Sequence, residues 1–456
     1  MSRWWRTVFL AIPILALAEE PYRPAITPSD CSFLQNPDEF LYDGEAIHTM
    51  RSNETEKVSA YRFALTVPEA SPVDAATIPQ KNFIDAAIFT RMAAAGIQSA
   101  PIASDAEFLR RITLDLTGRI PSATDLDAFL ADTNAGKRDA KIDALVGSPE
   151  FNDKWTMFFG DLVKNNANAT NVNRFTEGRD AFYLYLKDAV STNKPYDVMA
   201  REMITGAGDS FVVGQANWAV GGTVPMGPAQ DTYDGTAVNL ATMFMGINTV
   251  DCLFCHDGAR HLDEVSLWGT GQMRQNMWGL SAYFSRTRIQ RQTISPMPNL
   301  LVKSIVSDNT TGTYSLNTTV GNRSARQPVN GVSSITPRYP FGTAANPGSG
   351  ILTGENYRQG LARQITADIQ FSRAAVNYIW EQFMVEAFVS PSNSIDLARL
   401  DPARPPAAPW TLQPTNADLL NSLATWFQQN KFDVRALAKL ITKSNAYQLS
   451  SVYPGT

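Results

Sequence analysis

Four residues able to bind a metal or a cofactor lie within ten positions of this 456-residue chain. The stretch VDCLFCHDGARH, residues 250–261, contains Cys252, Cys255, His256 and His261, although the whole chain has only three cysteines and three histidines. The first three form the pattern C-x-x-C-H, by which a c-type haem is attached. At helical spacing, positions i, i+3 and i+4 share one face, so two thiols and an imidazole can meet one planar group.

If one haem c is bound covalently here, His256 is the proximal iron ligand. A methionine as sixth ligand raises the reduction potential, a histidine lowers it, and an open position admits small ligands. The sequence does not choose among the candidates for that position, which are Met273, Met277, His261 and His48, with Met226, Met243 and Met245 as further methionines. Apolar neighbours in sequence are expected to cover part of the haem, namely Phe244, Met245, Ile247, Phe254, Trp268 and Trp278.

Two other interpretations of the cysteines stay open. A tetrahedral zinc site of the Cys3His type would use Cys31, Cys252 and Cys255 with His48, His256 or His261. Such a site would use the remaining cysteine, Cys31. Apart from the C-x-x-C pair, however, it lacks a second pair of ligands close together in the sequence. A thiol–disulfide pair usually opens a helix behind a strand, and the sequence predicts no strand before Cys252. The pattern therefore favours haem.

The first twenty residues, MSRWWRTVFLAIPILALAEE, have the layout of a secretory signal peptide. Arg3 and Arg6 precede an apolar run over residues 7–18, and small residues at its end predict cleavage after Ala18. That run falls short of the roughly 20 residues a helix needs to cross a bilayer. We therefore expect a periplasmic or secreted protein with no membrane span in the mature chain. Haem is attached to C-x-x-C-H outside the cytoplasmic membrane, so the two features agree.

The composition excludes several classes of protein. With 44% hydrophobic and 18% charged residues, the chain is typical of a well-packed globular protein rather than a disordered one. The 39 Lys and Arg residues against 44 Asp and Glu give a net charge of -5, with no polybasic run, which argues against nucleic acid as a partner. Three cysteines are too few for a disulfide framework, so the hydrophobic core must provide the stability.

The pattern of apolar residues predicts a mainly α-helical, multi-helical protein of two domains, with a region rich in loops and short hairpins between them. We expect a signal peptide over 1–18, an irregular N-terminal arm over 19–80, a helical cytochrome-c-like domain with C-x-x-C-H over 81–290, a Ser/Asn/Gly/Pro-rich connecting region over 291–350, and a C-terminal helical domain over 351–456.

Helix starts can be placed more closely than helix ends. N-cap residues are predicted at Ser104, at Ser122 or Thr124, at Ser148 with Pro149 in the first turn, and at Asp433. The segment 262–290 is predicted to be a helix. Within the connecting region, GTYSLNTTVG over 312–321 indicates a small hairpin.

Several segments resemble the secreted planctomycete-type cytochrome c proteins, which are built from two paired domains of unknown function. The resemblance runs from about Asn82 to Ser451. It rests on the segments FLRRITLDLTGRIPSATDLDAFL, SPEFNDKWTMFFGDLV and FMGINTVDCLFCHDG in the first domain, and on SRAAVNYIWEQFMVEAFVSPSNSI and FDVRALAKLITKSNAYQLSS in the second.

This resemblance implies an exported, mostly helical protein whose haem signature falls on Cys252, Cys255 and His256. Members of the family occur with further cytochrome modules and with sulfatase-like partners, which implies chemistry on surface polysaccharides. This chain departs from its relatives at one position of the motif. Relatives commonly have a second histidine in the sequence CHDHP, where this chain has Gly258.

The sequence thus favours an exported c-type haem protein that transfers single electrons to a redox partner protein. One alternative is an extracytoplasmic redox or hydrolytic enzyme linked to surface polysaccharide. The other is a secreted scaffold held by zinc or by a disulfide.

Overall fold

The computed structural model describes residues 71–169, 171–319, 324–342 and 348–453. The predicted signal peptide, the first part of the arm with Cys31 and His48, and the end of GTYSLNTTVG lie outside these residues. Within them the chain is rich in helix, as predicted. The α-helices are α4 (Phe83–Ala94), α5 (Asp105–Thr117), α6 (Ala123–Ala131), α7 (Lys137–Leu145), α8 (Pro149–Leu162), α9 (Phe175–Ser191), α10 (Tyr196–Thr205), α11 (Asn217–Val220), α12 (Ala229–Met245), α13 (Val250–Leu253), α14 (Leu267–Thr270), α15 (Arg274–Ser281), α16 (Tyr357–Ala367), α17 (Ile369–Met384), α18 (Ala417–Gln429) and α19 (Val434–Thr442).

The helix starts for which the sequence predicted an N-cap residue are confirmed. Ser104, Ser122 and Ser148 each accept a hydrogen bond from the backbone N–H three residues on, and Pro149 occupies the first turn of α8. Asp433 caps α19 in the same way. Each such cap satisfies an N–H group that has no partner within the helix and is worth about 1 kcal/mol.

The strands are short, apart from one antiparallel hairpin. β6 (Thr287–Ser295) pairs with β7 (Leu301–Asp308), and β5 (Gly208–Asp209) adds to the other edge of β7. The remaining strands form two-stranded pairs: β1 (Val73–Asp74) with β2 (Gln98–Ser99), β3 (Asn168–Ala169) with β4 (Val172–Asn173), and β8 (Tyr314–Ser315) with β9 (Ser334–Ile335). Short 3-10 helices are η2 (Ala75–Thr77), η3 (Gly214–Ala216), η4 (Ala282–Phe284) and η5 (Leu397–Arg399).

One long helix over 262–290 was expected, and this is wrong. The segment divides into α14, α15 and η4, and its last residues begin strand β6. The reason is tertiary, because residues from Thr287 onward find a pairing partner in β7. β8 does begin within 312–321, but its partner is β9 and not a neighbouring residue of the same segment.

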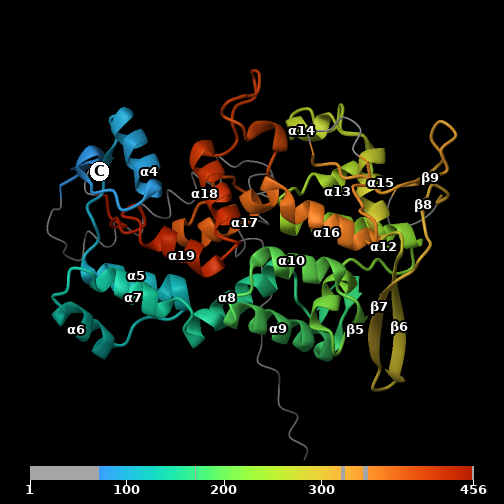
Figure 1. Ribbon diagram of the computed structural model, residues 1–456, viewed down its shortest axis with the longest axis horizontal. Helices are drawn as coiled ribbons and strands as arrows, with labels where there is room; N and C mark the ends of the chain where they lie inside the picture. The colour runs from blue at the N-terminus through green and yellow to red at the C-terminus, as the bar shows by residue number, and fades with distance from the viewer. Residues whose placement is uncertain (1–70, 170, 320–323, 343–347, 454–456) are drawn as a thin grey trace, which may run out of the picture. The chain divides into compact units, whose positions relative to one another are not determined.

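A division into two domains is not confirmed, because residues 67–456 form one compact unit. The main hydrophobic core contains buried side chains from Ile78 to Tyr447, and a smaller cluster lies around Ala374 and Ile395. Helix α16 packs against α10, and α17 packs against α12, so helices distant in sequence lie side by side (Figure 1). The two helical parts of the chain therefore complete each other's core.

Asp85 joins the beginning and the end of this unit. The side chain is fully buried in α4, and its carboxylate accepts the backbone N–H groups of Lys81, Asn445 and Ala446 at 2.8, 3.0 and 2.8 Å. In Figure 1 helix α18, near the end of the chain, lies beside α4 accordingly. A buried carboxylate is stable only when hydrogen bonds of this kind replace its hydration.

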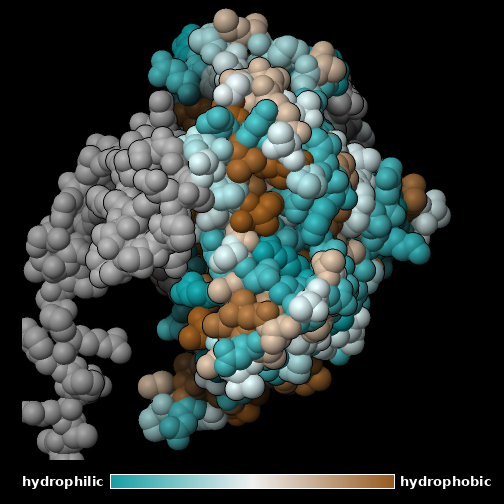
Figure 2. Space-filling model, turned by 90° about the vertical axis from the view of Figure 1, so that its left-hand side faces the viewer, coloured by the Kyte–Doolittle hydropathy of each residue, from teal (hydrophilic) through white to brown (hydrophobic). Residues whose placement is uncertain are grey.

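No helix among the described residues is long and apolar enough to cross a membrane. The surface seen in Figure 2 is mainly hydrophilic, with separate hydrophobic patches. Exposed apolar side chains occur in or beside α4 and α6, which lie on that side of the molecule, and include Ile97, Ile120 and Leu130.

We predict that Asp85→Ala lowers the free energy of unfolding by about 3 kcal/mol, because it leaves the buried N–H groups of Asn445 and Ala446 and the part-buried N–H of Lys81 without an acceptor. Urea denaturation followed by circular dichroism measures the change. Asp127→Ala is the control, since Asp127 is exposed on α6. Equal stability of the two variants would contradict this role of Asp85.

Candidate cofactor-attachment site

The C-x-x-C-H segment forms a single helical turn that follows the end of α12. Gly246 ends α12 with a left-handed backbone (φ 68°), and α13 then carries Cys252. The N–H groups of Cys255 and His256 both donate to the Cys252 carbonyl, at 3.0 and 3.2 Å. The helical spacing assumed for the three residues is therefore present.

The chemistry-bearing side chains of this turn are accessible. Cys252 is exposed, Cys255 is half-buried, and both thiols are free. His256 is exposed, whereas Leu253 and Phe254 are buried and anchor the turn in the core. Partial burial and the neighbouring Asp251 carboxylate raise the pKa of Cys252, so its thiol is protonated at neutral pH. A reactive redox cysteine needs the opposite shift, which weakens the thiol–disulfide interpretation.

The structure separates the candidates for a sixth iron ligand. His261 stacks on His256 with the ring centroids 4.3 Å apart, so it lies beside the proximal imidazole. Met277 is fully buried in α15, whereas the Met273 side chain is 60% exposed. His48 lies outside the described residues. Met273 is therefore the candidate that is both accessible and in the segment that contacts the motif.

Two hydrogen bonds hold that segment against the motif. The Gly258 N–H donates to the Gln272 carbonyl at 2.8 Å, and the Arg274 N–H donates to the Asp257 carboxylate at 2.7 Å. Met273 lies between these two contacts. Its backbone position is thereby fixed relative to His256.

Gly258, which stands where relatives have a histidine, has no room for a side chain. A Cβ at this position would lie 1.7 Å from the Gly269 carbonyl oxygen and 2.6 Å from its carbon. Both atoms are backbone of α14 and cannot move aside as a flexible side chain can. The backbone path of this chain therefore excludes the second histidine.

We expect Gly258→Ala to destabilise the protein by about 2 kcal/mol, because overpacking against rigid backbone costs roughly that much. Gly271→Ala is the matched control, since a Cβ there meets only the Trp268 carbonyl oxygen at 3.6 Å. Thermal unfolding of the two variants measures the difference. If both variants melt together, the α14 backbone does not constrain the motif.

Arg274 fastens the motif to the interior. Its Nε–H donates to the Phe254 carbonyl at 3.1 Å, and its guanidinium lies 4.7 Å from the centre of the Trp278 ring. Trp278 in turn stacks on Tyr314 at 6.5 Å, and Tyr314 lies 6.5 Å from Tyr233. A continuous series of contacts thus leads from the motif into the protein.

A buried ionic cluster lies at the inner end of this series. Arg326 binds Asp231 and Asp234 on α12 at 2.7 and 2.6 Å, and all three side chains are at most 1% exposed. Arg326 also donates to the Tyr314 hydroxyl, which donates to Asp234. Burial lowers the pKa of Arg326, but Asp234, Tyr314 and Asp231 together outweigh it, so that pKa lies above its usual range. The sequence offered one sign of this cluster, two acids at i and i+3 in an apolar helix.

The expected apolar cover of the haem is mostly packed elsewhere. Five of the six candidates are at most 3% exposed and belong to the core: Phe244, Met245, Ile247, Phe254 and Trp278. Trp268 is half-buried and stacks on Phe341. The two thiols and the imidazole are the groups that would hold a haem here, but most of the expected apolar cover is not free to surround it.

The zinc interpretation gains no support from the described residues, which contain no group of three or more His, Cys, Asp or Glu side chains arranged to hold a metal ion. Cys31 and His48, which the Cys3His proposal required, lie outside those residues.

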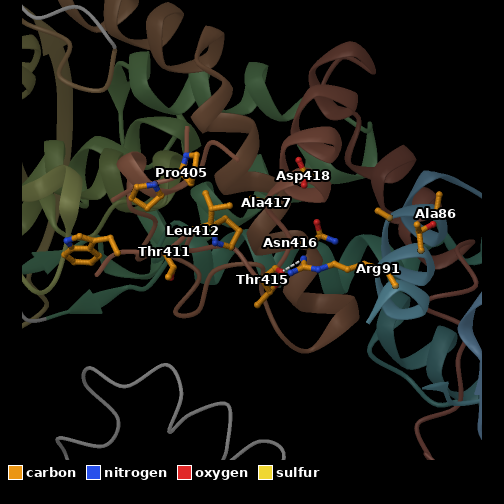
Figure 3. A pocket seen from close by; sticks show the side chains of 15 residues that line it. Ala86, Arg91, Pro405, Thr411, Leu412, Thr415, Asn416, Ala417 and Asp418 are labelled. Atoms are coloured by element: carbon orange, nitrogen blue, oxygen red, sulfur yellow. Dashed lines mark hydrogen bonds between the residues drawn. The ribbon is translucent and has the colours of Figure 1, made fainter. Parts of the chain in front are cut away.

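Two pockets lie apart from the motif residues. The larger, of about 990 Å³, lies between α4 and the proline-rich segment before α18. Arg91 crosses it to donate to the Thr415 carbonyl at 2.7 Å, with Asn416 and Asp418 nearby (Figure 3). The smaller, of about 300 Å³, lies between α12 and β6. Neither is lined by Cys252, Cys255 or His256.

Comparisons with known protein families match two regions of the chain. Residues 83–286 match the family PSCyt2, described as a protein of unknown function (DUF1549). Residues 357–455 match the family PSD1, described as a protein of unknown function (DUF1553). No curated protein and no solved structure matches the chain. The chain thus contains paired domains of unknown function, in the arrangement expected for the planctomycete-type family, and the motif lies within the first.

Proposed function

We propose that this protein is an exported c-type haem protein that transfers single electrons. The observation that carries the proposal is the exposed helical turn in which two free thiols and an imidazole occupy one C-x-x-C-H pattern. Residues 1–18 act as the signal peptide that brings the chain to the compartment where haem is attached.

Each of the three motif residues has its own role. Cys252 and Cys255 hold the macrocycle through thioether bonds, and His256 is the proximal ligand. When bound, haem supplies an iron centre that gains and loses one electron. Arg274 keeps the turn in place through Phe254 and Trp278. Because the turn lies at the surface, a redox partner protein could approach a haem held there.

We propose Met273 as the sixth ligand. Its side chain is free to move, and the contacts of Gln272 and Arg274 keep its backbone beside the motif. Met277 would have to leave the core to bind iron, and the His261 ring is already stacked on the His256 ring.

Expression in a host able to mature cytochromes tests the attachment. We expect the mature protein to carry the added mass of one haem and to begin at Glu19. Cys252→Ser with Cys255→Ser is expected to abolish the added mass, whereas Cys31→Ser leaves it unchanged. The measurement is intact-protein mass spectrometry of the periplasmic fraction. A wild-type protein without added mass would refute the haem proposal, and bound zinc that depends on Cys31 would favour the scaffold.

Carbon monoxide binding to the reduced protein tests the sixth ligand. We expect the wild type to resist carbon monoxide and Met273→Leu to bind it, because loss of the thioether opens the position. Met277→Leu is the matched control, and its conservative change in the core costs less than about 1.5 kcal/mol. Visible absorption spectra record the outcome. Carbon monoxide binding by the wild type would show an open iron and a different role for Met273.

A further inference from the structure

The pocket between α12 and β6 has walls suited to a flat organic body. Its volume is about 300 Å³, at the lower end of the range for small-molecule sites. Phe284, Tyr233 and Ile289 contribute rings and an aliphatic side chain, and Ala219 and Ala229 leave the space open. Four threonines, Asn309 and Arg288 complete the lining, so the wall combines apolar surfaces with polar groups.

The charge at the pocket is positive. Arg288 is the single ionisable cation among its lining residues, which contain no carboxylate. Arg288 is exposed and forms no ion pair with any described residue. Asp308 on β7, the partner strand of β6, is already paired with Arg358 at 2.7 Å, and Asp234 on α12 is paired with Arg326 at 2.6 Å. A guanidinium without a counter-ion beside an apolar cavity favours a carboxylate ligand.

Polar groups in the wall could also donate hydrogen bonds to an anion. The Thr223 hydroxyl is buried and has no hydrogen-bond partner within the described part of the chain. Tyr233 carries a hydroxyl that forms no hydrogen bond there either, and burial raises its pKa, so it stays a donor.

We propose that this pocket binds a small organic monoanion, with its carboxylate on Arg288 and its flat apolar body between Tyr233 and Phe284. The site is separate from the cysteines and does not depend on haem. Benzoate has the required size, flatness and charge, and is the simplest probe.

Isothermal titration of the full-length protein with benzoate tests the proposal. We expect saturable binding, and binding at least tenfold weaker to Arg288→Gln, the loss expected for one charge-assisted hydrogen bond. Arg291→Gln is the matched control, because Arg291 is exposed three residues further along β6 and does not line the pocket. Benzamide, the neutral analogue, is expected to bind at least tenfold more weakly than benzoate.

A second variant locates the ligand. Ala229→Trp places an indole at the pocket wall, where it is expected to block benzoate while circular dichroism shows an unchanged fold. The proposal is overturned if benzoate does not saturate the protein, if benzamide binds equally well, or if Arg288→Gln behaves as Arg291→Gln. Full benzoate affinity in Ala229→Trp would also overturn it, since the ligand would then lie elsewhere.

Discussion

The packing of Phe371 holds together the parts of this protein that the sequence keeps far apart. The ring lies on α17, within the second matched region, and is fully buried. It stacks on Tyr196 of α10 at 5.0 Å and lies 6.4 Å from Phe244 of α12, both within the first region. Burial of such large rings is the main source of stability in a core. Without the other region, each region would expose its apolar surface to water.

Other residues of the C-terminal region determine where the C-x-x-C-H turn lies. Beside Phe371, the Gln370 amide donates to the Met245 carbonyl at 2.7 Å, and the Ile395 N–H donates to the Gly246 carbonyl at 2.8 Å. Both bonds satisfy carbonyls at the end of α12, which a helix leaves without partners. The C-terminal region therefore fixes the end of α12, and through it the direction in which the chain enters the turn with Cys252.

The helical class and the helix starts could be predicted because they depend on local chemistry. Ser104 and Ser148 cap their helices through bonds only three residues long. The helix expected over 262–290 fails because Thr287 and its neighbours gain a strand partner in β7, and propensity is a weak guide where tertiary pairing competes. Similarly, the shared main core could not be anticipated from the composition change near residue 291, since a loop-rich segment does not reveal whether the helices on either side share a core.

For the site, the sequence by itself determined the two thiols, the imidazole and their spacing, because a helical turn places i, i+3 and i+4 together wherever it occurs. Only the tertiary structure decided what surrounds them. Met273 lies beside the turn, Met277 does not reach solvent, and Gly258 has no room for a histidine because α14 packs against it. These outcomes depend on backbone contacts between segments, which no local pattern of residues encodes.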